Sequence, residues 1–151
     1  MDVRVPQRGT TTVEFAIVGA VLLTVIFAAI EFGRIVFTLN MLQEGARRAA
    51  RVAAVCAVGN PAVADAAVFM TLPGLTTSNV AVEYLDQGGA PLANPAGANY
   101  SLIHYVRVRI VNYSFPIAIP FINPTFVAPE FSSTLPRESL GVPKFGAAPA
   151  C

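Results

Sequence analysis

The stretch that decides the fold is Arg8-Gly9-Thr10-Thr11-Thr12-Val13-Glu14-Phe15, which leads directly into Ala16–Ile30, a run without charge or proline. As an α-helix, the residues from Thr10 to Ile30 would rise about 30 Å, which matches the hydrocarbon core of a bilayer. We therefore predict a transmembrane helix whose only charge is Glu14. A carboxylate in hydrocarbon costs roughly 2.5–3.5 kcal/mol, so Glu14 marks a functional site and requires a partner.

The helical pattern continues beyond the apolar run. Apolar residues recur there at steps of three and four, and polar residues occupy another face, which is typical of an amphipathic helix. Gly59-Asn60-Pro61 predicts its end, because glycine suits a left-handed cap and proline cannot continue a helix. We predict one helix over residues 10–58, roughly 70 Å long, with residues 1–9 as a short leader. The apolar positions are Phe32, Ile35, Val36, Leu39, Leu42, Ala46, Ala49 and Ala53.

The remainder, residues 59–151, predicts a small α+β head. Asn60 suits the N-cap of a second short helix that begins at Pro61 and ends near Met70. After Pro73-Gly74 the apolar period becomes two, which indicates strands. The fold class is therefore α+β: a long helix, transmembrane in its first half, with a small antiparallel sheet. The predicted strands are Val80–Tyr84, Ile103–Tyr113 and Phe131–Glu138, the last ending by Pro136, and residues 86–99 and 116–129 are predicted loops.

Composition argues against several function classes. The chain has 151 residues, a net charge of +1 and 10 Lys+Arg, which is too few for a nucleic-acid surface. Two cysteines and one histidine lack the spacing of a metal site, and His104 has no companion acid or cysteine. We expect no catalytic, cofactor-binding or metal residues. Arg47, Arg48 and Arg51 are expected on a solvated helix face, and Arg107 and Arg109 on the outer face of a strand.

A cleaved secretory signal is the rival interpretation of the N-terminus, with Arg4 and Arg8 as its basic region. The long apolar run and the continuing helical pattern favour a span that is retained. Orientation is not decided by charge, because arginines lie on both sides of the span.

The partner of Glu14 need not be a side chain. If the chain were cut after Gly9, Thr10 would gain a free α-amine, and a carboxylate four residues along could neutralise it in the same chain or a neighbour. The alternative is a hydrated acid near the membrane surface, since Glu14 lies only about 7 Å along the helix.

Arg8-Gly9 followed by Thr10-Thr11-Thr12-Val13-Glu14-Phe15 resembles the class III signal of type IV pilin-like proteins. Phe15 directly after Glu14 looks more like the Tad/Flp branch, and Thr10 rules out N-methylation of a phenylalanine. The Ala/Arg-rich residues 44–51, the small head and Arg137-Glu138-Ser139-Leu140-Gly141-Val142-Pro143 resemble the TadE-like family. The resemblance thus covers nearly the whole chain.

This resemblance implies a non-enzymatic minor pilin or pseudopilin of a Tad/Flp-type pilus, active in adhesion and surface attachment. Gly9 and Thr10 would form the processing site, and Glu14 with Phe15 would set register during assembly. Implied partners are prepilin peptidase, other Tad pilins and pseudopilins, the inner-membrane assembly platform and membrane lipid. The implied location is the bacterial inner membrane, with the leader cytoplasmic and the head outside, and with later incorporation into the pilus. The alternative is an uncleaved, single-pass envelope protein with a small binding or adhesive head.

Cys56 and Cys151 are candidates for a disulfide, because an oxidising compartment outside the cytoplasm favours pairing. The bridge would close a long loop and, in the chain-entropy model, contribute about 4–5 kcal/mol. The alternative is a small buried thiol and an unpaired thiol at the tail.

Overall fold

The longest element of the computed structural model, which describes residues 9–68, 72–119, 123–142 and 151, is a single helix. Helix α1 (Thr10–Val55) begins immediately after Gly9, whose carbonyl accepts a hydrogen bond from the Val13 amide at 3.4 Å. The chain divides into two units, Met1–Val36 and Phe37–Cys151, so α1 contributes its first part to one unit and its last part to the other.

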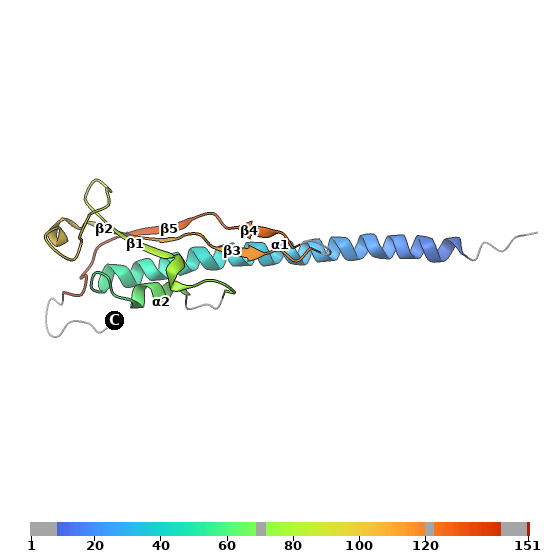
Figure 1. Ribbon diagram of the computed structural model, residues 1–151, viewed down its shortest axis with the longest axis horizontal. Coiled ribbons are helices and arrows are strands. Elements are labelled where there is room, and N and C mark those ends of the chain that lie inside the picture. Colours follow the sequence, from blue (N-terminus) through green and yellow to red (C-terminus); the bar gives the residue numbers. More distant parts are fainter. Residues whose placement is uncertain (1–8, 69–71, 120–122, 143–150) are drawn as a thin grey trace, which may run out of the picture. The chain divides into compact units, whose positions relative to one another are not determined.

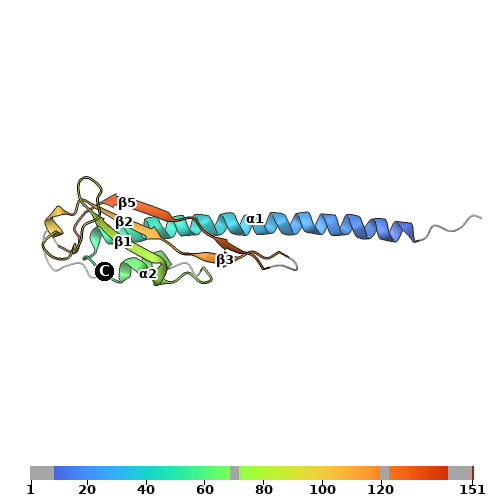
Figure 2. The same ribbon diagram turned by 45° about the horizontal axis from the view of Figure 1, so that its top comes forward.

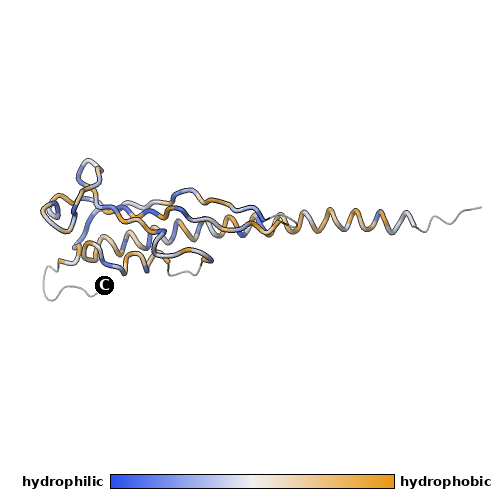
Figure 3. The backbone as a smooth tube through the Cα atoms, in the orientation of Figure 1, coloured by the Kyte–Doolittle hydropathy of each residue, from blue (hydrophilic) through white to orange (hydrophobic). Residues whose placement is uncertain are grey.

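In the first unit, α1 is apolar on all sides. Its large side chains are exposed, and hydrophobic residues occur on every turn (Figure 3). The helix has no proline that would interrupt its backbone hydrogen bonds, and it therefore satisfies its own polar groups without water. Glu31 and Arg34 form an ion pair one turn apart directly beyond Ile30.

In the second unit, a three-stranded antiparallel sheet and a short helix accompany the last part of α1 (Figure 1). Strand β2 (Tyr105–Ile110) lies between β1 (Val80–Leu85) and β5 (Phe131–Pro136). Helix α2 (Ala62–Val68) follows α1, and short 3₁₀ turns precede β1 (Thr77–Asn79) and β2 (Tyr100–Leu102). The predicted α+β fold, a long N-terminal helix with a small antiparallel sheet, is confirmed.

The core of the head is built on a face of small residues of α1. Val63 and Ala67 of α2 and the inward residues of β2 pack in the same core. Small side chains let these elements approach closely: a Cβ added at Gly45 would lie 2.7 Å from the Ala67 carbonyl oxygen and 3.4 Å from Cδ1 of Ile110. The fully or nearly fully buried residues of this face are Leu42, Gly45, Ala46, Ala49, Ala50, Ala53 and Ala54.

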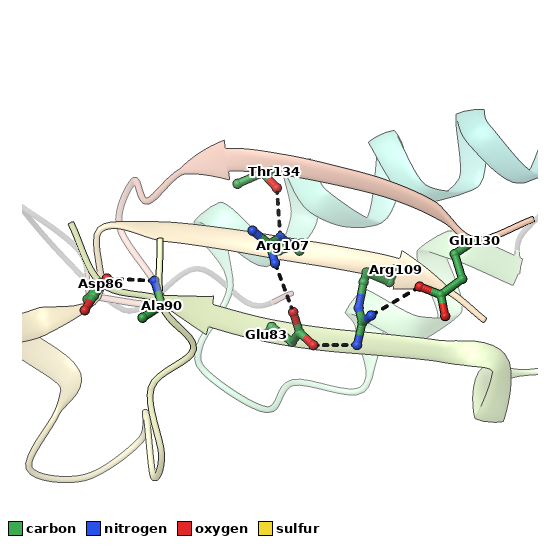
Figure 4. A network of polar contacts seen from close by, with 7 residues as sticks. All are labelled: Glu83, Asp86, Ala90, Arg107, Arg109, Glu130 and Thr134. Carbon is green, nitrogen blue, oxygen red and sulfur yellow. Dashed lines mark hydrogen bonds and ion pairs between the residues drawn. The ribbon is translucent and has the colours of Figure 1, made fainter. Parts of the chain in front are cut away.

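The outer face of the sheet carries an ion-pair network (Figure 4). Glu83 of β1 contacts Arg109 at 2.6 Å and Arg107 at 3.6 Å across the β1–β2 ladder. Arg109 also reaches Glu130 at 3.2 Å, and Arg107 donates to the Thr134 hydroxyl at 3.3 Å. Because these groups are partly exposed, each pair contributes at most about 1 kcal/mol. Arg107 and Arg109 thus lie on the outer face, as predicted, while Val106, Val108 and Ile110 point inward.

The end of α1 is held by a segment far away in sequence. The carbonyl of Ala54 accepts from the amides of Glu138 (3.0 Å) and Leu140 (3.3 Å). The carbonyl of Val55 accepts from the Gly141 amide (2.6 Å) and the Ser139 hydroxyl (3.0 Å). Helix-terminal carbonyls have no partner within their own helix, so residues 138–141, which we call the cap segment, supply four donors to the end of α1.

Several predicted boundaries differ from the structure. Helix α1 ends at Val55 rather than Val58, because the cap segment takes the carbonyls of Ala54 and Val55. Gly59, predicted as the left-handed cap of α1, adopts φ +79° in a turn after the helix has already ended, and the Asn60 side chain accepts from the Ala62 amide at 2.9 Å. The predicted end of the second helix at Met70 lies outside the described residues. Strand β2 is shorter than predicted because Asn112, at φ 54°, interrupts it.

The prediction of a loop over residues 116–129 is wrong. Strands β3 (Ser114–Pro116) and β4 (Thr125–Val127) pair there as a separate antiparallel hairpin. The prolines suggested a loop because they cannot donate to a ladder. Pro116 ends β3, however, and Pro124 and Pro129 flank β4, so none of the three stands inside a strand.

We predict that Gly141→Ala destabilises the head by about 1–3 kcal/mol. Gly141 has φ +79°, and an added Cβ would lie 2.8–2.9 Å from atoms of Ala57, so the cap segment would have to withdraw from α1. Denaturation of the purified chain in detergent, followed by near-UV circular dichroism, measures this, because all 4 tyrosines lie in the head. Gly97→Ala is the matched control, since its nearest new contact is 3.7 Å away. Equal stability of the two variants would contradict the role of the cap segment.

Candidate assembly site

The predicted processing junction lies at the start of α1. Gly9 is the last residue before the helix, and a Cβ placed there would meet no atom within 4 Å. Its φ also lies outside the left-handed region, so neither space nor backbone conformation requires glycine at this position. The fold therefore gives no reason for glycine at this position, whereas recognition by another protein would be one.

Glu14 and Phe15 lie in the second turn of α1, and both side chains are exposed. Residues four apart share a helix face, so Glu14 lies on the same face as Thr10, one turn further along. Phe15 is 79% exposed and extends the apolar surface beside the carboxylate. The predicted processing residue Thr10 and the predicted assembly residue Glu14 therefore lie on one face of α1, one turn apart.

Apart from Glu14, the described surface around these residues is apolar along α1 from Val13 to Ile30. By length and composition, α1 could cross a membrane, and its most apolar stretch is not buried within the protein. A signal sequence can have the same length and composition. Monomeric soluble proteins rarely expose so large a continuous apolar surface. The exposed side chains include Val13, Ile17, Val18, Val21, Leu22, Leu23, Val25, Ile26, Phe27 and Ile30.

A disulfide joins Cys56 to Cys151, with the two Cα atoms 5.8 Å apart. Cys56 directly follows α1 and is 4% exposed, so the bridge attaches the last residue of the chain to the end of the helix. The cap segment contacts the same end of α1. Two separate links therefore hold the C-terminal part of the chain at this place.

The turn after α1 is also attached to the sheet. The Tyr84 hydroxyl of β1 accepts a hydrogen bond from the Gly59 amide at 3.4 Å. Burial raises the pKa of this hydroxyl, while the bond from Gly59 lowers it by a smaller amount. The Tyr84 hydroxyl thus links β1 to the turn after α1.

The remaining predicted polar residues lie on the surface. Arg47, Arg48 and Arg51 are exposed on α1, and His104 is exposed just before β2. In the part of the chain that the structure describes, no three His, Cys, Asp or Glu side chains gather in a group that could hold a metal ion.

Sequence reasoning did not find the cap segment's contact with α1 or the shared role of Glu83. The Arg-Glu-Ser-Leu-Gly motif at 137–141 was noted only as part of the family resemblance, and no structural role was predicted for it. The only local signal is Gly141, since glycine tolerates positive φ; in the structure Leu140 (45°) and Gly141 (79°) both adopt it, and Leu140 is buried.

These features define a protein with an apolar helix able to span a membrane and a small α+β head on the same helix. Residues 9–51 match the family model described as TadE-like protein, which confirms the predicted TadE-like resemblance over this part of the chain. The match begins at Gly9 and includes Thr10, Glu14, Phe15 and the arginines of α1. The head beyond residue 51 lies outside it. Searches of curated proteins and of solved structures found no match.

We predict that reduction of the Cys56–Cys151 bridge lowers the free energy of unfolding by about 4–5 kcal/mol in the chain-entropy model. The bridge spans 95 residues, so its loss frees a long loop in the unfolded chain. Denaturation of the chain with and without reductant measures the difference. The variant with both Cys56→Ser and Cys151→Ser should be as unstable as the reduced chain and insensitive to reductant. An unchanged midpoint after reduction would show that the bridge does not stabilise the head.

Proposed function

We propose that this protein is a minor pilin or pseudopilin that takes part in assembling a Tad/Flp-type pilus for surface attachment. The observation that carries this proposal is the exposed carboxylate of Glu14, one turn into a helix that begins directly after Gly9 and is apolar from Phe15 to Ile30. The match of residues 9–51 to the TadE-like family supports it. The role is structural: the chain packs with partners and catalyses no reaction.

In this proposal, prepilin peptidase removes residues 1–9 by cutting after Gly9. The cut removes the Gly9 carbonyl that accepts from the Val13 amide, and it leaves an α-amine on Thr10. The new amine and the Glu14 carboxylate have opposite charges near neutral pH. At a separation of 4 Å their attraction is about 1 kcal/mol in water and about 4 kcal/mol at an effective dielectric constant of 20.

This pair can fix the axial register between neighbouring helices. An unpaired carboxylate costs roughly 2.5–3.5 kcal/mol at the centre of a bilayer, so a position that leaves Glu14 without an amine is disfavoured. Apolar side chains by themselves specify register weakly, because sliding by one turn replaces one hydrophobic contact with another. In this proposal the Glu14 carboxylate therefore sets the axial position of one helix against its neighbour. The apolar surface, including Phe15, supplies the area over which the two helices pack.

The proposed arrangement has the leader in the cytoplasm, the span in the bacterial inner membrane and the head outside. An outside location agrees with the Cys56–Cys151 disulfide, since such bonds persist in oxidising compartments. The proposed partners are prepilin peptidase, other Tad pilins and pseudopilins, the inner-membrane assembly platform and membrane lipid. The proposal needs no cofactor and no nucleic acid.

The first test is the N-terminus of the purified protein. In a host that contains the peptidase, intact mass and N-terminal sequencing should show a chain that begins at Thr10, and in a host without it the chain should begin at Met1. A chain that keeps Met1 in both hosts would overturn the pilin proposal and leave an uncleaved, membrane-anchored envelope protein with a binding or adhesive head.

The second test concerns the charge of Glu14. We predict that Glu14→Ala and Glu14→Gln leave membrane insertion intact but strongly impair pilus assembly, because each removes the partner of the Thr10 amine. Glu31→Gln is the matched control, since Glu31 lies beyond the span and pairs with Arg34. Electron microscopy of surface pili together with membrane fractionation separates assembly from insertion. Normal piliation with Glu14→Gln would exclude an electrostatic role for this residue.

A further inference from the structure

The two cysteines of the Cys56–Cys151 disulfide differ in their exposure to solvent. Cys56 is 4% exposed, and its amide donates to the Val52 carbonyl at 2.9 Å, so its backbone continues the last turn of α1. Cys151 is exposed. Figures 1 and 2 both show residue 151, marked C, beside α2 and the end of α1. One sulfur of the bridge therefore belongs to a buried helix end, and the other belongs to an exposed residue.

The cap segment holds the backbone on both sides of Cys56. Before Cys56, the Val55 carbonyl accepts from the Gly141 amide at 2.6 Å and from the Ser139 hydroxyl at 3.0 Å. After Cys56, Gly141 lies so close to Ala57 that an added Cβ would be 2.9 Å from the Ala57 nitrogen and Cα. Cys56 can therefore turn toward solvent only when the cap segment separates from the end of α1.

The bridge borders an open groove at the surface of the head. The groove has a volume of about 470 Å³ and lies between the last turn of α1 and the beginning of α2. Both cysteines line it, together with Arg51, Val52, Val55 and Ala62. A thiol of another molecule therefore has an approach to the bridge from solvent.

Thiol–disulfide exchange needs access to one particular sulfur of a bridge. A thiolate attacks that sulfur, forms a mixed disulfide with it and expels the other sulfur as a thiolate. Reactivity follows exposure, so the two sulfurs of this bridge are not equivalent. Attack at Sγ of Cys151 expels the Cys56 thiolate and leaves the cap segment in place, whereas attack at Sγ of Cys56 requires the cap segment to withdraw.

We propose that Cys151 is the residue through which an external disulfide or thiol closes and opens the bridge, and that Cys56 is the resolving cysteine. In closure, the Cys151 thiolate attacks the disulfide of the oxidant, binds one of its sulfurs in a mixed disulfide and releases the other. The Cys56 thiolate then attacks Sγ of Cys151 and releases the second sulfur of the oxidant. Two electrons pass to the oxidant, and the protons of the two cysteine thiols pass to its two thiolates. Opening by a dithiol follows the same steps in reverse.

The head can stay folded while the bridge is open. The four hydrogen bonds of the cap segment involve neither sulfur, so reduction does not remove them. Exchange at Cys151 uses only residues of the second unit, and it is independent of the proposed cut after Gly9 and of pilus assembly. A redox partner can thus act on the folded subunit.

Single-cysteine variants of the full chain in detergent test the proposal. Cys56→Ser leaves Cys151, and Cys151→Ser leaves Cys56. Each reduced variant is mixed with glutathione disulfide or, in a second arm, with an oxidised Cys-X-X-Cys oxidoreductase, and intact mass follows the mixed disulfide. We expect Cys56→Ser to react at least about tenfold faster than Cys151→Ser, because a buried thiol reacts only after local opening. In denaturing urea the two rates should become equal, since both thiols are then exposed.

Equal rates for the two folded variants with both reagents, or faster reaction of Cys151→Ser, would overturn the proposal. A difference with glutathione disulfide assigns the exchange to small disulfides, and a difference with the oxidoreductase alone assigns it to a protein. The unsubstituted chain gives the same test if a variant fails to fold. It is treated with reduced glutathione and quenched in acid, and peptide mapping should then find glutathione on Cys151. Glutathione mainly on Cys56 would contradict the assignment.

The shielding of Cys56 by the cap segment has its own test. Gly141→Ala, added to Cys151→Ser, should raise the reaction rate of Cys56 toward the rate in urea, because the added Cβ forces the cap segment away from Ala57. Gly97→Ala in the same background is the control and should leave the rate unchanged. A Cys56 rate that does not respond to Gly141→Ala would show that the cap segment does not shield this thiol.

Discussion

The carbonyl groups at the end of α1 are the constraint on which the rest of the head depends. The carbonyl oxygens of Ala54 and Val55 lie at the helix end, where no amide of the same helix can donate to them. The cap segment provides four hydrogen-bond donors to these two oxygens. Each bond contributes about 1 kcal/mol, and an unsatisfied carbonyl in this buried place would cost about 1–3 kcal/mol. Because the cap segment follows β5 directly, these bonds also set the position of β5 along the helix, and through the ladders that of β2 and β1.

The small residues of α1 complete this arrangement. Gly45 and the alanines around it leave room for α2 and β2 to pack close to the helix axis. A small head of this kind gains much from a covalent link. The Cys56–Cys151 bridge closes the chain at the same helix end where the cap segment binds. The hydrogen bonds of the cap segment and the Cys56–Cys151 disulfide thus both hold the C-terminal part of the chain at the end of α1, while close packing holds α2 and β2 against the helix.

One helix therefore works in two environments. From Val13 to Ile30, α1 exposes large apolar side chains and the carboxylate of Glu14, which suits lipid and neighbouring helices. Over the second unit it buries alanines beneath a sheet whose outer face is polar and ion-paired. The change takes place around Glu31, Arg34 and Phe37. The proposed pilus subunit would need such a division, because its first part would exchange lipid for neighbouring helices while its head stays folded.

The sequence by itself determined the long helix, its apolar first part, the three main strands and the residues Gly9, Thr10, Glu14 and Phe15 of the candidate site. These follow from local signals: the period of apolar residues, the position of a lone charge, and the glycine and proline that end a helix. Only the tertiary structure showed that α1 ends at Val55, that Glu83 forms ion pairs with both Arg107 and Arg109, and that the proline-rich segment contains a hairpin. The physical reason is distance along the chain: Ser139 and Val55 are 84 residues apart, and no local pattern states which remote donor will reach a given carbonyl.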